Sequence, residues 1–192
     1  TGSIVSTKKI KQIIDIASKN DCWILSDEVY RGAELNGLES PSFYGSYEKT
    51  IVSAGLSKAY RLPGLRLGWT IGPKNYIKKA WAFHDYTSVS IAYHSDWIAS
   101  KILDSKRRRI ILDGTKRHLN ENLNTLVDWI DTLDGKLSII TPQAGAISFV
   151  RIHLNTNSQD LTYHIIDNYS VLLTAGKWFG LEGFLRFGFG PP

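Results

Sequence analysis

The chain has 192 residues, of which 43% are hydrophobic and 21% are charged, so it is long enough to bury a core. No run approaches the roughly 20 consecutive apolar residues that a membrane span requires, and no basic segment followed by an apolar signal core opens the chain. We therefore expect a globular, cytoplasmic protein without a membrane partner. The single Cys22 excludes an internal disulfide and a cysteine metal cluster, which fits a reducing compartment.

The formal net charge is +5, and the densest basic run covers residues 106–109, Lys-Arg-Arg-Arg. Such a run could meet the phosphates of nucleic acid. Apolar residues follow immediately at positions 110–112, a pattern that favours a helix whose basic face is solvated. We expect no nucleic-acid partner.

The chain begins at Thr1 without an initiator methionine, contains no methionine at all, and ends at Pro192 just after a strand-like run. The absence of methionine is unusual for a chain of this length. We therefore expect either that the chain is a piece of a longer one or that modified methionines are missing from its sequence.

The first half of the chain alternates predicted helices and strands. Ser6 is a candidate N-cap for an amphipathic helix over residues 10–17, where apolar residues recur at helical spacing. Residues 22–25 form a short apolar run that predicts a buried strand, and further strands are predicted over 50–53 and 65–71. This alternation predicts a mainly parallel α/β sheet, in which ligands collect at the carboxyl ends of the strands.

The second half begins with long helical patterns and continues with short strands. Helices are predicted over residues 75–82 and 97–129, and one apolar face of the second carries Leu119, Leu123, Leu126 and Ile130. Beyond these, strands are predicted near 137–139, 147–152, 171–174 and 184–189, with a helix over 161–169. We place a domain boundary at residue 105, with a larger unit over 1–105 and a smaller α+β unit over 106–192.

Residues 57–69, Ser-Lys-Ala-Tyr-Arg-Leu-Pro-Gly-Leu-Arg-Leu-Gly-Trp, contain the most informative motif. Ser-Lys followed by Pro-Gly-x-Arg-x-Gly, with Arg66 eight residues after Lys58, is a specific signature. Two further motifs are Ser-Asp-Glu-Val-Tyr at 26–30 and Leu-Arg-Phe-Gly-Phe-Gly at 185–190. With these three motifs in this order, the sequence resembles the fold-type-I pyridoxal-phosphate (PLP) enzymes, class I/II aminotransferases of the aspartate aminotransferase superfamily.

The resemblance implies an architecture as well as a family. It predicts the C-terminal part of a mainly parallel, three-layer PLP-transferase large domain, followed by a smaller α+β C-terminal domain. The preceding half of such a protein would hold a glycine-rich phosphate loop and an aromatic residue stacked on the cofactor ring.

The resemblance makes Lys58 the catalytic and cofactor-holding residue. A lysine amine forms a Schiff base with the aldehyde of pyridoxal 5′-phosphate and then moves a proton from the substrate Cα. An isolated lysine would otherwise be read as a surface residue on a turn. The Pro-Gly-x-Arg-x-Gly frame favours the functional interpretation.

The resemblance implies four further cofactor-binding residues. Asp27 would pair with the pyridine nitrogen, although an aspartate at a strand end is also a common turn or cap residue. Tyr30 would hydrogen-bond the ring's 3′ oxygen, its alternative being a buried core tyrosine. Arg66 would bind the phosphate with help from Ser57.

One position departs from the family pattern, and one further residue is implied to bind the substrate. The family commonly has a small hydroxyl residue three positions before the lysine, where this chain has Gly55. Arg186 stands where the family binds the substrate α-carboxylate; its alternative is an exposed arginine on an edge strand.

Weaker candidates are His84, Asp85 and Tyr86, which we expect to follow a helix and to lie near the active site. The remaining histidines are too scattered for a metal-ligand motif, so no metal is expected.

The implied function is transfer of an amino group between an L-amino acid and a 2-oxo acid by a PLP-dependent homodimer. The same residues would also serve β-elimination, decarboxylation or oxidation, because the PLP carbanion is common to these reactions. A second interpretation is a PLP-fold sensor domain of a transcription regulator, which would bind ligands without turnover.

Overall fold

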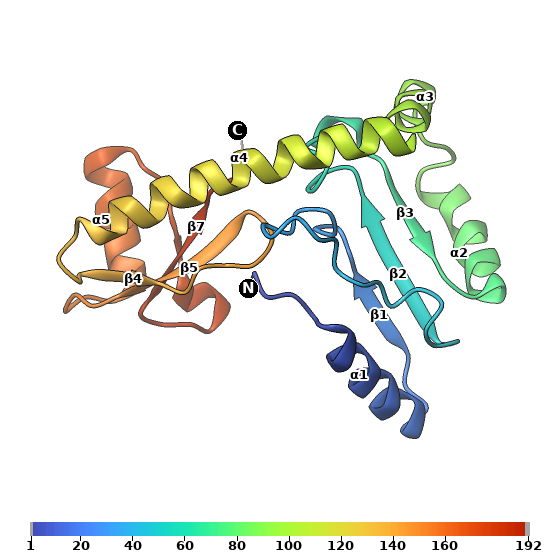
Figure 1. The fold of residues 1–192 in the computed structure, drawn as a ribbon, viewed down its shortest axis with the longest axis horizontal. Helices are drawn as coiled ribbons and strands as arrows, with labels where there is room; N and C mark the ends of the chain where they lie inside the picture. Colours follow the sequence, from blue (N-terminus) through green and yellow to red (C-terminus); the bar gives the residue numbers. More distant parts are fainter. Residues whose placement is uncertain (1, 191–192) are drawn as a thin grey trace. The chain divides into compact units, whose positions relative to one another are not determined.

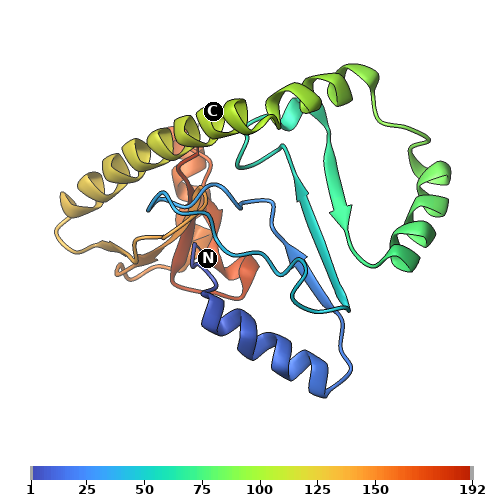
Figure 2. The same cartoon turned by 45° about the vertical axis from the view of Figure 1, so that its right-hand side comes forward.

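The computed structural model describes residues 2–190 and contains two compact units. Among these residues, one unit comprises 4–116, and the other comprises 2–3 together with 117–190 (Figures 1 and 2). Helix α4 (Ser105–Asp131) contributes to both. The boundary that we predicted at residue 105 coincides with the start of α4, whereas the compact units separate within the helix, after Lys116. The first turns of α4 belong to the first unit because Leu112 and Thr115 are buried there, each 2% exposed.

The first unit opens with a helix capped as the sequence predicts. The Ser6 hydroxyl accepts a hydrogen bond from the Lys9 amide at 3.3 Å, and the helix ends at Asn20. The elements of the first unit follow the predicted order but differ in length. Before α4, they are α1 (Thr7–Lys19), β1 (Ile24–Asp27), β2 (Thr50–Gly55), the 3-10 turn η1 (Pro63–Leu65), β3 (Gly68–Ile71), α2 (Lys74–Thr87) and α3 (Tyr93–Ile102). The single helix predicted over residues 97–129 is instead two helices, α3 and α4.

The sheet of the first unit is mixed rather than mainly parallel. Strand β1 pairs with β2 in parallel, from Ile24 opposite Thr50 to Asp27 opposite Ser53. Strand β3 pairs with β2 in the antiparallel direction, with Gly55 opposite Gly68. The connection agrees with this direction: a loop with one 3-10 turn and no α-helix joins β2 to β3, whereas parallel strands are usually joined through an α-helix.

Strand β1 is buried on one face only, which corrects the expectation of a buried strand. Ile24 is 9% exposed, but its neighbour Leu25 is 74% exposed. A continuous apolar run predicts burial on both faces, and in this chain the second face of β1 is uncovered among the described residues. The buried apolar residues of the unit include Ile10, Ala17, Ile24, Ile51, Val52, Leu56, Ala59, Leu67, Ala99 and Leu112.

The second unit contains an antiparallel sheet whose strands follow the order β4-β5-β7-β6. Its elements are β4 (Leu137–Ile139), β5 (Ile147–Ile152), α5 (Ser158–Tyr169), β6 (Thr174–Ala175), the 3-10 turn η2 (Gly176–Phe179) and β7 (Phe184–Gly188). The strand predicted over 171–174 is reduced to Thr174–Ala175, and Leu172 before it is 74% exposed.

One face of this sheet is core and the other is open. Val150, Ile152 and Leu185 are at most 7% exposed, and so are Leu119, Leu123 and Ile130 on the predicted apolar face of α4. The Asn122 side chain donates to the Phe189 carbonyl at 3.0 Å, which ties α4 to the end of β7. Because strand side chains alternate, the residues between these buried ones point to the open face.

Gly176 is required where η2 turns against the end of β6. A Cβ at this position would lie 2.2 Å from the Leu181 carbonyl oxygen and 2.5 Å from that of Phe184. We expect Gly176→Ala to lower the free energy of unfolding by about 2 kcal/mol or more, because the backbone must shift. Urea denaturation would measure it. Gly188→Ala, with nothing within 4 Å of the added Cβ, is the control, and equal losses in both variants would contradict the expectation.

Candidate active site

The loop that carries Lys58 lies beside the end of β1. Because β1 and β2 are parallel, their carboxyl ends meet at the same edge of the sheet, where Asp27 is the last residue of β1. The Ala59 amide donates to the Val29 carbonyl at 3.5 Å, and the Glu28 amide donates to the Ser53 carbonyl at 2.8 Å. The structure therefore brings the segment after β1 and the segment after β2 together, as the motifs predict.

A tight turn presents Lys58. The Leu56 amide donates to the Leu67 carbonyl at 3.1 Å, and the Leu62 amide donates back to the Leu56 carbonyl at 3.0 Å. Leu56 and Ala59 are 0% exposed, whereas Lys58 between them is exposed. Buried apolar residues thus hold the backbone while the amine stays accessible.

The predicted cofactor residues have donors and acceptors to spare. Asp27 accepts one hydrogen bond, from the Val29 amide to Oδ1 at 3.1 Å. Arg66, in the left-handed conformation with φ 48°, donates from Nη1 to the Pro63 carbonyl at 3.0 Å. Tyr30 and Ser57 are half-buried. No hydrogen bond or ion pair within the described part of the chain joins these side chains to each other or to Lys58.

The close approach of two strands explains why position 55 is glycine and not the hydroxyl residue of the family pattern. A Cβ at Gly55 would lie 3.2 Å from both the Gly68 Cα and the Leu67 carbonyl oxygen. A Cβ at Gly68 would lie 2.9 Å from the Ala54 carbonyl oxygen. The strands β2 and β3 approach so closely at this pair that a hydroxyl side chain at position 55 would need the backbone to move.

Two carboxylates that sequence reasoning did not single out order the segment after Asp27. Glu28 accepts from the hydroxyls of Ser26 and Ser42 and from the Phe43 amide, at 3.2, 2.8 and 3.1 Å. Glu34, 1% exposed, accepts from the Gly32 amide and from the amide and hydroxyl of Ser40. Most of these partners lie at irregular separations along the chain, so no sequence periodicity signals them.

Arg108 corrects our interpretation of the basic run. Lys106, Arg107 and Arg109 are exposed as expected. The Arg108 side chain is only 28% exposed and donates through Nη1 and Nη2 to the Glu39 carboxylate, at 2.6 and 2.8 Å. Its position on the inward side of α4 brings one cation of the run to the loop that carries Lys58.

Arg186 lies in the second unit, on the open face of its sheet. It is paired in register with Phe149, so the two side chains share that face. The guanidinium carbon lies 5.8 Å from the ring centroid of Phe179, and Phe149 meets Phe179 edge-on at 5.6 Å. Arg186 is half-buried in strand β7, which pairs with β5 and β6, so it is not on an edge strand.

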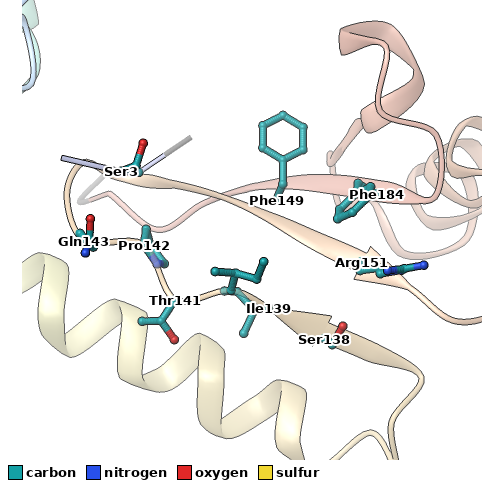
Figure 3. Close-up of a pocket in the computed structure, with 11 residues that line it drawn as sticks. Ser3, Ser138, Ile139, Thr141, Pro142, Gln143, Phe149, Arg151 and Phe184 are labelled. Carbon is teal, nitrogen blue, oxygen red and sulfur yellow. The ribbon is translucent and has the colours of Figure 1, made fainter. Parts of the chain in front are cut away.

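A cavity of about 540 Å³ opens on the same unit (Figure 3). Phe149 and Phe184 are its aromatic lining residues, and Arg151 lines it as well. Arg151 is paired in register with Phe184, so the open face carries a second guanidinium beside the aromatic residues. Other lining residues are Ser3, Ser138, Ile139, Thr141, Pro142 and Gln143.

The remaining candidates lie elsewhere. His84, Asp85 and Tyr86 belong to α2 rather than following it; His84 stacks on Trp81 with ring centroids 5.5 Å apart, and Tyr86 is 90% exposed. Within residues 2–190, no cluster of three or more His, Cys, Asp or Glu side chains is arranged to hold a metal ion. The helices of the same range include none with the length and apolarity needed to cross a membrane.

Comparison with known sequences matches the family described as "Aminotransferase class I and II" over residues 1–192. The chain belongs to this family. Among curated relatives, aromatic-amino-acid aminotransferase 2 of Thermococcus litoralis is 27% identical over 98% of this chain and 50% of its own length. Capreomycidine synthase of Streptomyces vinaceus is 25% identical over 100% of this chain and 49% of its own length.

The α/β fold is shared with solved aminotransferase structures. A PLP-dependent aminotransferase from Streptococcus suis superposes with a TM-score of 0.89 and 32% sequence identity, over 98% of this chain and 49% of that one. This chain spans about half the length of the curated relatives that it matches. That the matched half is the C-terminal portion stays a prediction.

Glu39 makes part of the stability dependent on pH. The hydrogen bonds from Arg108 lower the pKa of the Glu39 carboxyl, and burial opposes them only in part. Because the folded-state pKa lies below the unfolded value of about 4.3, the contribution is present above that value and lost as pH falls through the folded-state pKa.

We expect Glu39→Gln to be less stable than the wild type by about 1–3 kcal/mol at pH 7, and the gap to shrink as the pH falls through the lowered folded-state pKa of Glu39. Urea denaturation across this range would measure both proteins. A gap that does not change with pH would contradict the assignment.

Proposed function

We propose that the full-length protein is a PLP-dependent aminotransferase that moves an amino group between an L-amino acid and a 2-oxo acid. Membership of the aminotransferase family supports this activity. The observation that carries the proposal is the placement of the Lys58 loop beside the end of β1, where Asp27 stands. A homodimer stays a prediction from the resemblance, and a cytoplasmic location stays a prediction from the sequence.

The side chains of the first unit fit the chemistry of pyridoxal 5′-phosphate. The cofactor has an aldehyde, a phosphate and a pyridine nitrogen, which require an amine, a cationic donor and a carboxylate. Lys58 offers an exposed amine, Arg66 a guanidinium with only its Nη1 donor used, and Asp27 a carboxylate with only its Oδ1 used, as far as residues 2–190 are concerned.

Each residue has a distinct task in this proposal. Lys58 would hold the cofactor through its amine and would move the proton at the substrate Cα. Asp27 holds a proton on the pyridine nitrogen. Tyr30 donates to the ring oxygen, and Arg66 with Ser57 binds the phosphate. The bound cofactor supplies the electron sink that makes the substrate Cα acidic.

Arg186 binds the substrate α-carboxylate through its guanidinium fork. The Phe179 ring beside the guanidinium carbon supports this role, because stacking orients the planar group without consuming its N–H donors. No hydrogen bond or ion pair within the described residues occupies that fork. The guanidinium therefore has two parallel donors available for a carboxylate.

The assignment of Lys58 is tested by trapping the cofactor on the full-length protein. We expect borohydride reduction of the PLP-loaded protein to leave a pyridoxyl group on Lys58, located by peptide mass spectrometry. Lys58→Arg should lose the modification and at least about 1000-fold of the activity, because the covalent link and the proton carrier disappear together. Lys79→Arg, at an exposed lysine of α2, should behave as the wild type.

The reaction is tested by following the amino group. An amino acid added alone to the PLP-loaded protein should yield one 2-oxo acid per bound PLP. A different 2-oxo acid added afterwards should receive the amino group. Loss of the amino acid without this exchange would contradict transamination and favour another PLP reaction. This arm matters because one relative is named a synthase.

Arg186 is tested by a conservative change. We expect Arg186→Lys to raise KM for the amino acid by about 10- to 100-fold and to leave PLP affinity unchanged, because lysine lacks the bidentate fork. Arg151→Lys, on the same face of the sheet, is the matched control. An unchanged KM in Arg186→Lys would remove the assignment.

A further inference from the structure

We propose that Arg108 and Thr115 of α4 are positioning residues for Lys58, because they hold the two residues that directly follow it in the chain. The inference rests on the proposed function of Lys58. All the contacts concerned lie within the unit of residues 4–116.

Thr115 holds the peptide group next to Lys58. Its hydroxyl donates to the Ala59 carbonyl at 2.9 Å, which is shorter than its 3.1 Å approach to the Ile111 carbonyl one helical turn back. Thr115 is 2% exposed and Ala59 is 0% exposed, so no solvent replaces the bond. Loss of the hydroxyl would leave a buried carbonyl without its partner from α4.

The contact on the other side of the same residue is weaker. The Ala59 amide reaches the Val29 carbonyl at 3.5 Å, at the outer limit of hydrogen bonding. The bond from Thr115 is therefore the stronger of the two restraints on Ala59. Helix α4, rather than the segment after β1, fixes this point of the loop.

Arg108 holds the next residue, Tyr60. Its Nε donates to the Tyr60 hydroxyl at 2.9 Å, while Nη1 and Nη2 bind the Glu39 carboxylate. All three guanidinium nitrogens are thus engaged, and Arg31 adds a further cation 3.4 Å from Glu39. A guanidinium held at three points has one orientation, and Tyr60, 6% exposed, is held with it.

The consequence concerns the Lys58 amine. Lys58 is exposed, and no side chain in the described part of the molecule hydrogen-bonds its amine, so the position of its backbone sets the reach of the amine. A displacement of about 1 Å in a reacting group can cost about 100-fold in rate. Contacts from α4 that fix residues 59 and 60 therefore act on the reaction without touching its atoms.

The test uses three variants of the full-length, PLP-loaded protein and one control. Thr115→Val removes one hydroxyl at nearly constant volume, and Thr115→Ser restores it. Arg108→Lys keeps the charge but loses the fork. Arg107→Lys, on the exposed side of the same helix, is the control.

Two readouts besides activity separate positioning from general stability. The first is amide hydrogen exchange of the loop peptide 56–62 in the cofactor-free protein, compared with exchange in β5. The second is the dissociation constant of PLP. We expect Thr115→Val and Arg108→Lys each to raise loop exchange and the dissociation constant by about tenfold, with β5 unchanged, and Thr115→Ser and Arg107→Lys to match the wild type.

Several outcomes would overturn the proposal. They are unchanged loop exchange in Thr115→Val and Arg108→Lys, faster exchange in β5 as well as in the loop, or failure of Thr115→Ser to restore the wild-type values. Failure of the proposed function gives a different result: the wild-type protein would then bind no PLP on Lys58. Loop exchange is measured without cofactor, so the difference between Thr115→Val and the wild type would still be measurable.

Discussion

The parallel pairing of β1 with β2 is the constraint on which the candidate site depends. It places the carboxyl ends of both strands at one edge of the sheet, so Asp27 and the Lys58 loop become neighbours although 31 residues of sequence number separate them. The close approach of β2 and β3 at Gly55 and Gly68 then sets the path by which the chain leaves β2. A tight turn with buried flanks follows, and it presents one exposed lysine.

The site is supported mainly by groups that take no part in the chemistry. Glu28 and Glu34 gather serine hydroxyls and backbone amides, and they order the segment after β1. Arg108 and Thr115 reach the Lys58 loop from α4, a helix whose remaining turns belong to the second unit. In the second unit, Arg186 lies beside Phe179 in the interior of its own sheet. The packing within each unit thus fixes the position of that unit's own candidate residues.

Local patterns predicted most of the elements and failed where distant contacts decide. The cap at Ser6 and the apolar face of α4 at Leu119, Leu123 and Ile130 were predictable because neighbours in the sequence determine them. The mixed direction of the first sheet was not, because the chain returns from β2 to β3 without the α-helix that usually joins parallel strands. Arg108 was predicted to be solvated like the rest of the basic run 106–109. Charge alone does not show which side of a helix meets Glu39.

The sequence by itself determined the family, through motifs whose residue types and spacing suit one cofactor, and it identified the lysine at their centre. Tertiary structure decided which residues lie around the loop that carries this lysine. Glu39, Tyr60 and Thr115 come near it only because two loops and a helix far apart in the chain pack together. Hydrogen bonds between such segments form only where their atoms approach to about 3 Å, and a linear pattern of residue types does not show which distant segments approach each other.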